Sequence, residues 1–139
     1  MTDPAREPCA DGSHRDAHSI LAELVRRTVR GHKRARYLDL ISRPNSRPKF
    51  LAVIHHELEW EIDRTRALPT LPDALLDLPA YCYAPRRDFG SPLSSLREVV
   101  ESAEDSLIAI ARDGSAALLR PEDWRSDPIC FHWGAVRRR

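Results

Sequence analysis

The residues best suited to chemistry lie in one short stretch, HHELEWEID, which runs from His55 to Asp63. Histidine and carboxylate side chains are common zinc ligands and common groups in general acid–base catalysis. On a helix, Glu59 lies one turn from His55 and also near His56, so these three side chains could converge on a metal ion. One hypothesis is therefore a metal-dependent enzyme that uses His55, His56 and Glu59.

The spacing within this stretch argues against a shared site. Helical zinc motifs place two histidines four residues apart, whereas His55 and His56 are adjacent and point about 100° apart on a helix. The acids of the stretch are distributed around the helix and do not face one pocket: Glu57, Glu59, Glu61 and Asp63. We therefore predict no cofactor.

A second set of metal-ligand types lies near the N-terminus. Cys9, His14 and His18 are all residues that can bind zinc, but their spacing matches no structural zinc pattern. Whether they ever bind a metal stays open, and residues of a flexible arm are the simpler interpretation.

A basic run precedes the histidine stretch. Between Arg26 and Lys49 the chain has nine basic residues and one acid, Asp39, which is a local charge of +8. On one continuous helix, such residues form a basic stripe with an aromatic ring at its end, and this arrangement can grip a phosphate backbone. No helix-turn-helix signature accompanies the run. Nucleic-acid binding is the second hypothesis, and its candidate residues are Arg26, Arg27, Arg30, Lys33, Arg34 and Tyr37.

The same charges also fit an internal match. If two helices joined near residues 43–46 run antiparallel, Glu57 lies level with about residue 32 and Asp63 with about residue 26. The acids of HHELEWEID would then neighbour the basic run and select the register of the hairpin. Whether that match neutralises the whole basic face stays open.

Apolar periodicity predicts two N-terminal helices. The first begins near Asp16, has a weak point at Gly31 and ends before the proline-rich segment 42–48. The second runs from about Pro48 to Asp63. The short connection between them favours an antiparallel helical hairpin. The buried face of the first helix is expected to contain Ala17, Ile20, Leu21, Leu24, Thr28, Ala35 and Leu38.

The rest of the chain predicts a small sheet. Strands are expected at residues 80–84, 106–111 and 129–133, a helix beginning at Ser91–Pro92, and a hairpin turn at Asp113–Gly114. The continuous apolar run 106–111 is typical of a strand that is covered on both faces. The strands before and after the helix should form a right-handed parallel pair. The expected fold class is α/β (α+β), with an N-terminal antiparallel helical hairpin followed by a small mixed sheet of β-α-β plus hairpin type.

Composition favours one domain in a reducing compartment. The 139 residues are 42% hydrophobic and 31% charged, with a net charge of +1, which is ordinary for a globular protein. We predict a flexible arm at 1–15, a single α/β domain at 16–134 and a basic tail at 135–139. Cys9, Cys82 and Cys130 are odd in number and unrelated in spacing, so we interpret them as thiols and not as a disulfide framework. The N-terminus has no signal-peptide core and no apolar run could span a membrane, so a cytoplasmic location is expected.

Glycine placement excludes several enzyme classes. The five glycines are far apart, so no phosphate-binding loop, dinucleotide fingerprint or nucleophile elbow can be assembled. The predominance of arginine over lysine suggests a GC-rich, bacterial genome. The principal hypothesis is a small, non-enzymatic accessory module that binds a protein partner, comparable to an antitoxin or immunity protein.

Overall fold

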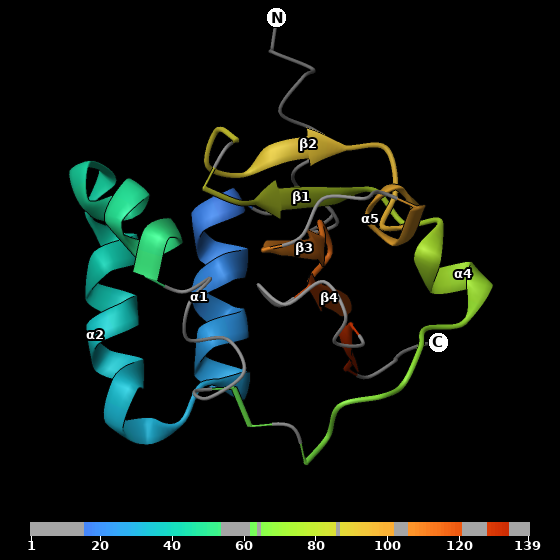
Figure 1. Cartoon of the computed structure of the whole chain (residues 1–139), viewed down its shortest axis with the longest axis horizontal. Coiled ribbons are helices and arrows are strands. Elements are labelled where there is room, and N and C mark those ends of the chain that lie inside the picture. Colours follow the sequence, from blue (N-terminus) through green and yellow to red (C-terminus); the bar gives the residue numbers. More distant parts are fainter. Residues whose placement is uncertain are drawn as a thin grey trace, which may run out of the picture.

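Figure 1 shows the computed structural model of the chain, in which residues 16–53, 62–63, 65–85, 87–101, 106–120 and 128–133 are described. The helical elements are α1 (Ala17–Thr28), α2 (Gly31–Ser42), the 3-10 turn η2 (Pro44–Ser46), α4 (Asp73–Leu76) and α5 (Arg97–Glu101). Residues 47–53 are also helical. The strands are β1 (Ala80–Tyr83), β2 (Ser91–Leu93), β3 (Leu107–Ala111), β4 (Ala116–Arg120) and β5 (Ile129–His132).

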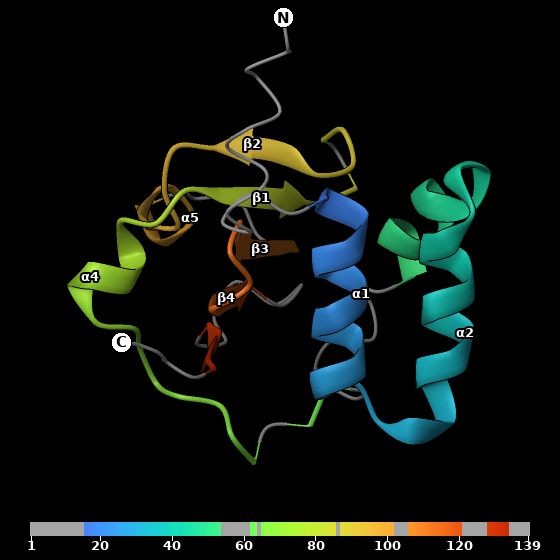
Figure 2. The same ribbon diagram turned by 180° about the vertical axis from the view of Figure 1, so that it is seen from behind.

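These elements form three layers. The helices α1 and α2 lie side by side on one side of the sheet, and the short helices α4 and α5 lie on the other (Figures 1 and 2). The predicted α+β class, with a helical hairpin before a sheet, is confirmed.

The sheet has the order β2-β1-β3-β4-β5, and every pair of neighbouring strands is antiparallel. The expected parallel pairing of β1 with β3 is therefore wrong. The prediction failed because it did not include the strand β2. This strand begins at Ser91–Pro92, where the start of a helix was predicted. Because β2 and β3 are both antiparallel to β1, they run parallel to each other. The β-α-β unit is thus β2-α5-β3, with β1 lying between its two strands.

Both faces of the sheet are buried. All five residues of β3 are buried, which confirms the interpretation of this run as a strand covered on both sides. Ile108 and Ile110 belong to the core beneath α1 and α2, and Leu107 and Ala109 belong to a second core beneath α4 and α5. This alternation follows from the two-residue period of a strand.

The predicted first helix is not continuous, because it is broken at Val29. Val29 has an extended backbone, and the chain then resumes as α2 from Gly31. The weakness expected at Gly31 is real, and α1 and α2 form a hairpin that turns at residues 29–30. The chain turns a second time at η2, where the turn near residues 43–46 was predicted, and the helical residues 47–53 pack back against α2 through Phe50 and Tyr37.

The break is fixed by a segment from further along the chain. Ile62 forms an antiparallel β-bridge with Val29, and the Asp63 N–H donates to the Thr28 carbonyl at 2.6 Å. The predicted second helix therefore ends before Ile62. Residues 54–61, which hold most of HHELEWEID, lie outside the described residues.

The C-terminal predictions are confirmed with one adjustment. The strands β3 and β4 form a hairpin, but its connection comprises residues 112–115 and not the Asp113–Gly114 pair alone. Gly114 has a φ of 80°, and Asp113 accepts a hydrogen bond from the Ser115 N–H at 2.9 Å. The expected last strand is present as β5.

Candidate binding cleft beside the last strand

The predicted basic stripe does not form as one helix face. Arg26 and Arg27 lie at the end of α1, Arg30 lies in the break, and Lys33 and Arg34 lie in the first turn of α2. The break changes the direction of the chain between these groups, so they surround the α1–α2 corner.

Tyr37 is not available to a ligand. Its side chain is 0% exposed and packs edge-on against Phe50, with ring centroids 5.7 Å apart. The ring was predicted to lie beside the basic residues because the prediction assumed one continuous helix. In the folded chain it is part of the core between α2 and residues 47–53.

Several arginines of the run bind other groups of the protein itself. The Arg34 guanidinium donates to the Val29 carbonyl from Nε at 3.3 Å and from a terminal nitrogen at 3.2 Å, which stabilises the break between α1 and α2. Arg47 Nε donates to the Ile41 carbonyl at 2.8 Å, and Arg43 pairs with Asp39 at 2.9 Å. Part of the +8 charge of the run therefore has a structural role.

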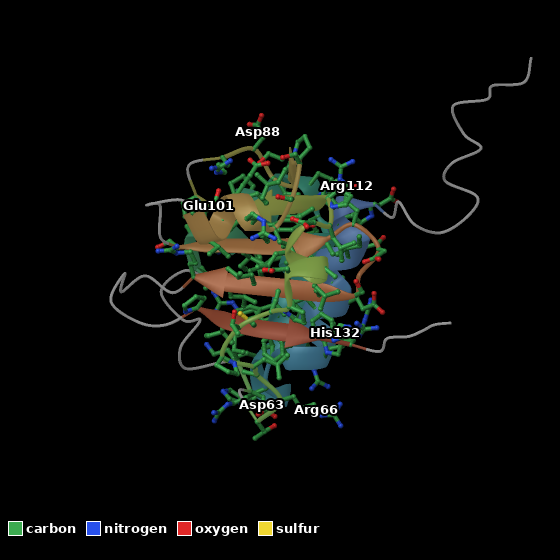
Figure 3. The ribbon with its side chains drawn as sticks, turned by 90° about the vertical axis from the view of Figure 1, so that its right-hand side faces the viewer. Asp63, Arg66, Asp88, Glu101, Arg112 and His132 are labelled. Carbon is green, nitrogen blue, oxygen red and sulfur yellow. The ribbon has the colours of Figure 1, made fainter. Side chains whose placement is uncertain are left out.

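A cleft of about 320 Å³ lies at the α1–α2 corner, beside β5. Three of its residues follow the bridge to α1, two belong to the end of the sheet, and one belongs to α1. They are Asp63, Thr65, Arg66, Phe131, Trp133 and Arg27. In Figure 3, Asp63 and Arg66 lie together at one end of the molecule, beyond the last strand.

Arg27 is held rigidly on one wall of the cleft. One terminal nitrogen donates to Glu23 at 2.8 Å, and the other donates to the Gly114 carbonyl at 3.3 Å. The guanidinium carbon lies 4.7 Å from the centre of the Trp133 ring, which is a cation–π contact. The Arg27 side chain is thus held by contacts with α1, with the β3–β4 turn and with the residue after β5.

The aromatic wall is also ordered. The Phe131 and Trp133 rings are stacked, with centroids 5.6 Å apart and planes within 3°. The backbone N–H of Trp133 donates to the Ser115 carbonyl at 2.8 Å. This hydrogen bond continues the pairing of β4 with β5 past the end of the strand. Phe131 is buried and Trp133 is half-buried, so the indole forms part of the cleft surface.

Asp63 supplies a negative charge at the rim. Hydrogen bonds from the backbone N–H and the hydroxyl of Thr65 lower the pKa of Asp63, and the charges of Arg30 and Arg66 lower it further. The carboxylate is therefore ionised at neutral pH. The backbone of Asp63 lies opposite Thr28, near the basic run, but the predicted charge match between two helices stays a prediction, because Glu57, Glu59 and Glu61 lie outside the described residues.

The metal hypotheses receive no structural test. His55, His56 and Glu59 lie outside the described residues, as do Cys9 and His14, while His18 is exposed on α1. Within the part of the chain that is described, no group of three or more His, Cys, Asp or Glu side chains is arranged to hold a metal ion. Burial raises the pKa of the Cys130 thiol, which disfavours the reactive thiolate.

Sequence reasoning identified Arg27 but missed the other five lining residues as a site. Trp133 and Phe131 had the only usable signal, since a tryptophan beside a short terminal strand is often partly exposed. None of the helices in the described ranges has both the length and the apolar composition of a membrane span. Comparison of the chain with family models, curated proteins and solved structures found no match.

Proposed function

We propose that the protein is a non-catalytic binding module for another protein, and that the cleft at the α1–α2 corner is its binding surface. The observation that carries this proposal is the fixed stack of Arg27 on Trp133 beside an open cleft. Tryptophan and arginine are the residues most enriched at the energetic centres of protein interfaces. Because Arg27 is already ordered, a partner that contacts it loses little side-chain entropy there.

The composition of the cleft favours a protein partner over a phosphate backbone. A surface that follows a phosphate backbone needs cations with few competing anions. Here the ionised Asp63 already interacts with the charges of Arg30 and Arg66, and Arg27 is paired with Glu23. Mixed charges around an aromatic centre are instead the usual arrangement of a protein interface, with a polar rim around an apolar core.

Co-purification from the native host with a set of matched variants tests this proposal. Arg66→Gln removes an exposed charge of the cleft, and Arg27→Gln removes the ordered guanidinium. Arg112→Gln is the control, because Arg112 also lies over an aromatic ring, at 5.2 Å from the centre of Tyr81, but elsewhere on the surface (Figure 3). After nuclease treatment, at least one protein should be recovered with the wild type and with Arg112→Gln but lost with both cleft variants. Equal recovery with all four proteins, or recovery of none, contradicts the proposal.

Phosphate-backbone binding is the second candidate function. Arg26 and Arg30 are exposed at the same corner, and Arg66 adds a further cation. Binding of a mixed-sequence oligonucleotide should then fall steeply with salt and disappear in Arg26/Arg30/Lys33→Glu. Undetectable binding at low salt would exclude this candidate.

The cellular context follows from composition. Cys82 and Cys130 are buried and form no disulfide, which supports a reducing compartment. We place the protein in a bacterial cytoplasm, where it would act as an accessory, antitoxin-like or immunity-like module.

A further inference from the structure

We infer that the cleft recognises a carboxylate, supplied by an aspartate or glutamate side chain in an acidic segment of the partner protein. This inference rests on the proposed protein-binding function and specifies the chemistry of the partner at the same site. The carboxylate would lie between Arg27 and Arg66, against the edge of the Trp133 indole.

The charge balance selects an anion. Two guanidinium groups, from Arg27 and Arg66, line the cleft together with one carboxylate, Asp63. Outside the lining, Arg30 lies close enough to lower the pKa of Asp63, and Glu23 pairs with Arg27. A net positive charge therefore remains among the described residues of the cleft. Arginine presents five N–H donors, and among the described residues two hydrogen bonds use donors of Arg27. Its remaining donors can bind a carboxylate in the geometry that arginine favours.

The lining favours a carboxylate over a phosphate. The ionised Asp63 lines the cleft next to Arg66 and offsets part of the attraction that the arginines exert on an anion. The net positive charge that remains is matched by a carboxylate with one negative charge, whereas a phosphate monoester carries up to two. The half-buried Trp133 ring also offers apolar surface to the methylene groups of an acidic side chain, and a bare phosphate has no such groups.

The size and openness of the cleft favour a side chain over a complete small molecule. A volume of about 320 Å³ is at the lower end for small-molecule sites. Asp63, Thr65 and Arg66 are all exposed, so the cleft cannot enclose most of a ligand's surface. One or two side chains of a protein segment that lies across the rim would fill it.

A fluorescently labelled tetraglutamate peptide, blocked at both ends, tests the inference by anisotropy. The wild type should bind it, and Arg66→Gln and Arg27→Gln should each weaken binding about tenfold, as for a lost charged contact. Asp63→Asn should strengthen binding about threefold, because it removes a competing and solvent-screened charge. Arg112→Gln and a tetraglutamine peptide are the matched controls, which should show unchanged binding and no binding respectively.

Competition separates this inference from the proposed function. If a host protein is retained through Arg27 and Arg66, excess tetraglutamate should displace it, whereas inorganic phosphate and an oligonucleotide at equal charge should not. Retention that depends on both arginines but resists tetraglutamate overturns the carboxylate inference and leaves the protein-binding function standing. Displacement by phosphate or oligonucleotide, or weaker peptide binding by Asp63→Asn, also overturns it.

Discussion

Gly90 lies against the first turn of α1, and its backbone has a φ of 69°. A Cβ atom at this position would be 2.5 Å from the Cβ of Ala17, which is closer than atoms in contact can approach. The adjacent Tyr83 hydroxyl donates to the Ala17 carbonyl at 2.5 Å. Glycine at position 90 therefore permits the loop before β2 and the start of α1 to pack together.

Gly90→Ala should destabilise the fold by about 2 kcal/mol, from the strained φ and the clash with α1. Gly31→Ala is the matched control. A Cβ there meets no atom within 4 Å, so this variant should be neutral or up to about 1 kcal/mol more stable through reduced entropy of the unfolded chain. Urea unfolding of both variants measures the difference. Equal effects of the two substitutions would show that the contact with Ala17 is not tight.

Tyr37 shows why residue identity alone misleads about a site. Its position four residues from Lys33 and three from Arg34 is typical of an exposed basic–aromatic stripe. In the fold it is 0% exposed, because α2 turns this face toward Phe50 and residues 47–53. Arg27 does contact an aromatic ring, but that ring belongs to Trp133, which is near the other end of the chain and not in the basic run.

At the scale of single elements, the break between α1 and α2 illustrates what local sequence can and cannot specify. Thr28 and Val29 are β-branched residues, which favour helices weakly, and Gly31 adds further weakness. These preferences predict a fragile region near Gly31. The actual position of the break depends on Ile62, Asp63 and the Arg34 guanidinium, and these partners are invisible to local periodicity.

The helix α5 begins with a capping arrangement around Glu98. This carboxylate accepts hydrogen bonds from the Ser94 hydroxyl, from the Ser94 N–H at 2.7 Å and from the Ser95 N–H at 3.3 Å. The Ser94 hydroxyl and then its backbone N–H are the main causes that lower the pKa of Glu98 below its usual 4.5. The serines and the glutamate thereby satisfy backbone donors before the first turn.

Glu98→Gln should destabilise the fold by about 0.5–1 kcal/mol at pH 7, discounted for an exposed position. Since the folded-state pKa is lowered, this stabilisation is complete above about pH 4.5 and is lost as pH falls through the folded-state value. Chemical unfolding at pH 7 and pH 3 should therefore show a smaller difference from the wild type at pH 3 than at pH 7.

Glu101→Gln is the control for this effect. Glu101 is at the C-terminal end of α5, where a negative charge opposes the helix dipole, so its loss should cost nothing. A Glu98→Gln penalty that is equally large at pH 3 and pH 7 would show that packing, and not the ionised cap, is responsible.

At the scale of the molecule, the layers were predictable and the strand pairing was not. The all-apolar run of β3 requires cover on both faces, and the two cores provide it. The strand β2 escaped prediction because Ser91–Pro92 is also a good helix start. Proline is tolerated in a strand at the edge of a sheet, which is the position of β2.

The cleft could not be predicted for a related reason. Arg27 is bound to Gly114, 87 residues away, and lies over Trp133, so the site exists only after β4 and β5 have paired. Charge clustering indicated the corner of the molecule at which the cleft lies, since Arg26, Arg27 and Arg30 are all there. It could not indicate which arginines the fold would use for its own backbone.

The most direct test of the central claim is a nuclear magnetic resonance titration of the labelled protein with tetraglutamate. The largest shifts should fall on the Arg27 and Arg66 side-chain N–H groups, the Thr65 amide and the Trp133 indole N–H. Signals of Arg112 and Tyr81 should stay unchanged. Shifts that centre instead on the groove of about 260 Å³ between α1 and α2, which is lined by residues such as His18 and Leu38, or the absence of shifts at millimolar peptide, would contradict the assignment of the cleft as the binding site.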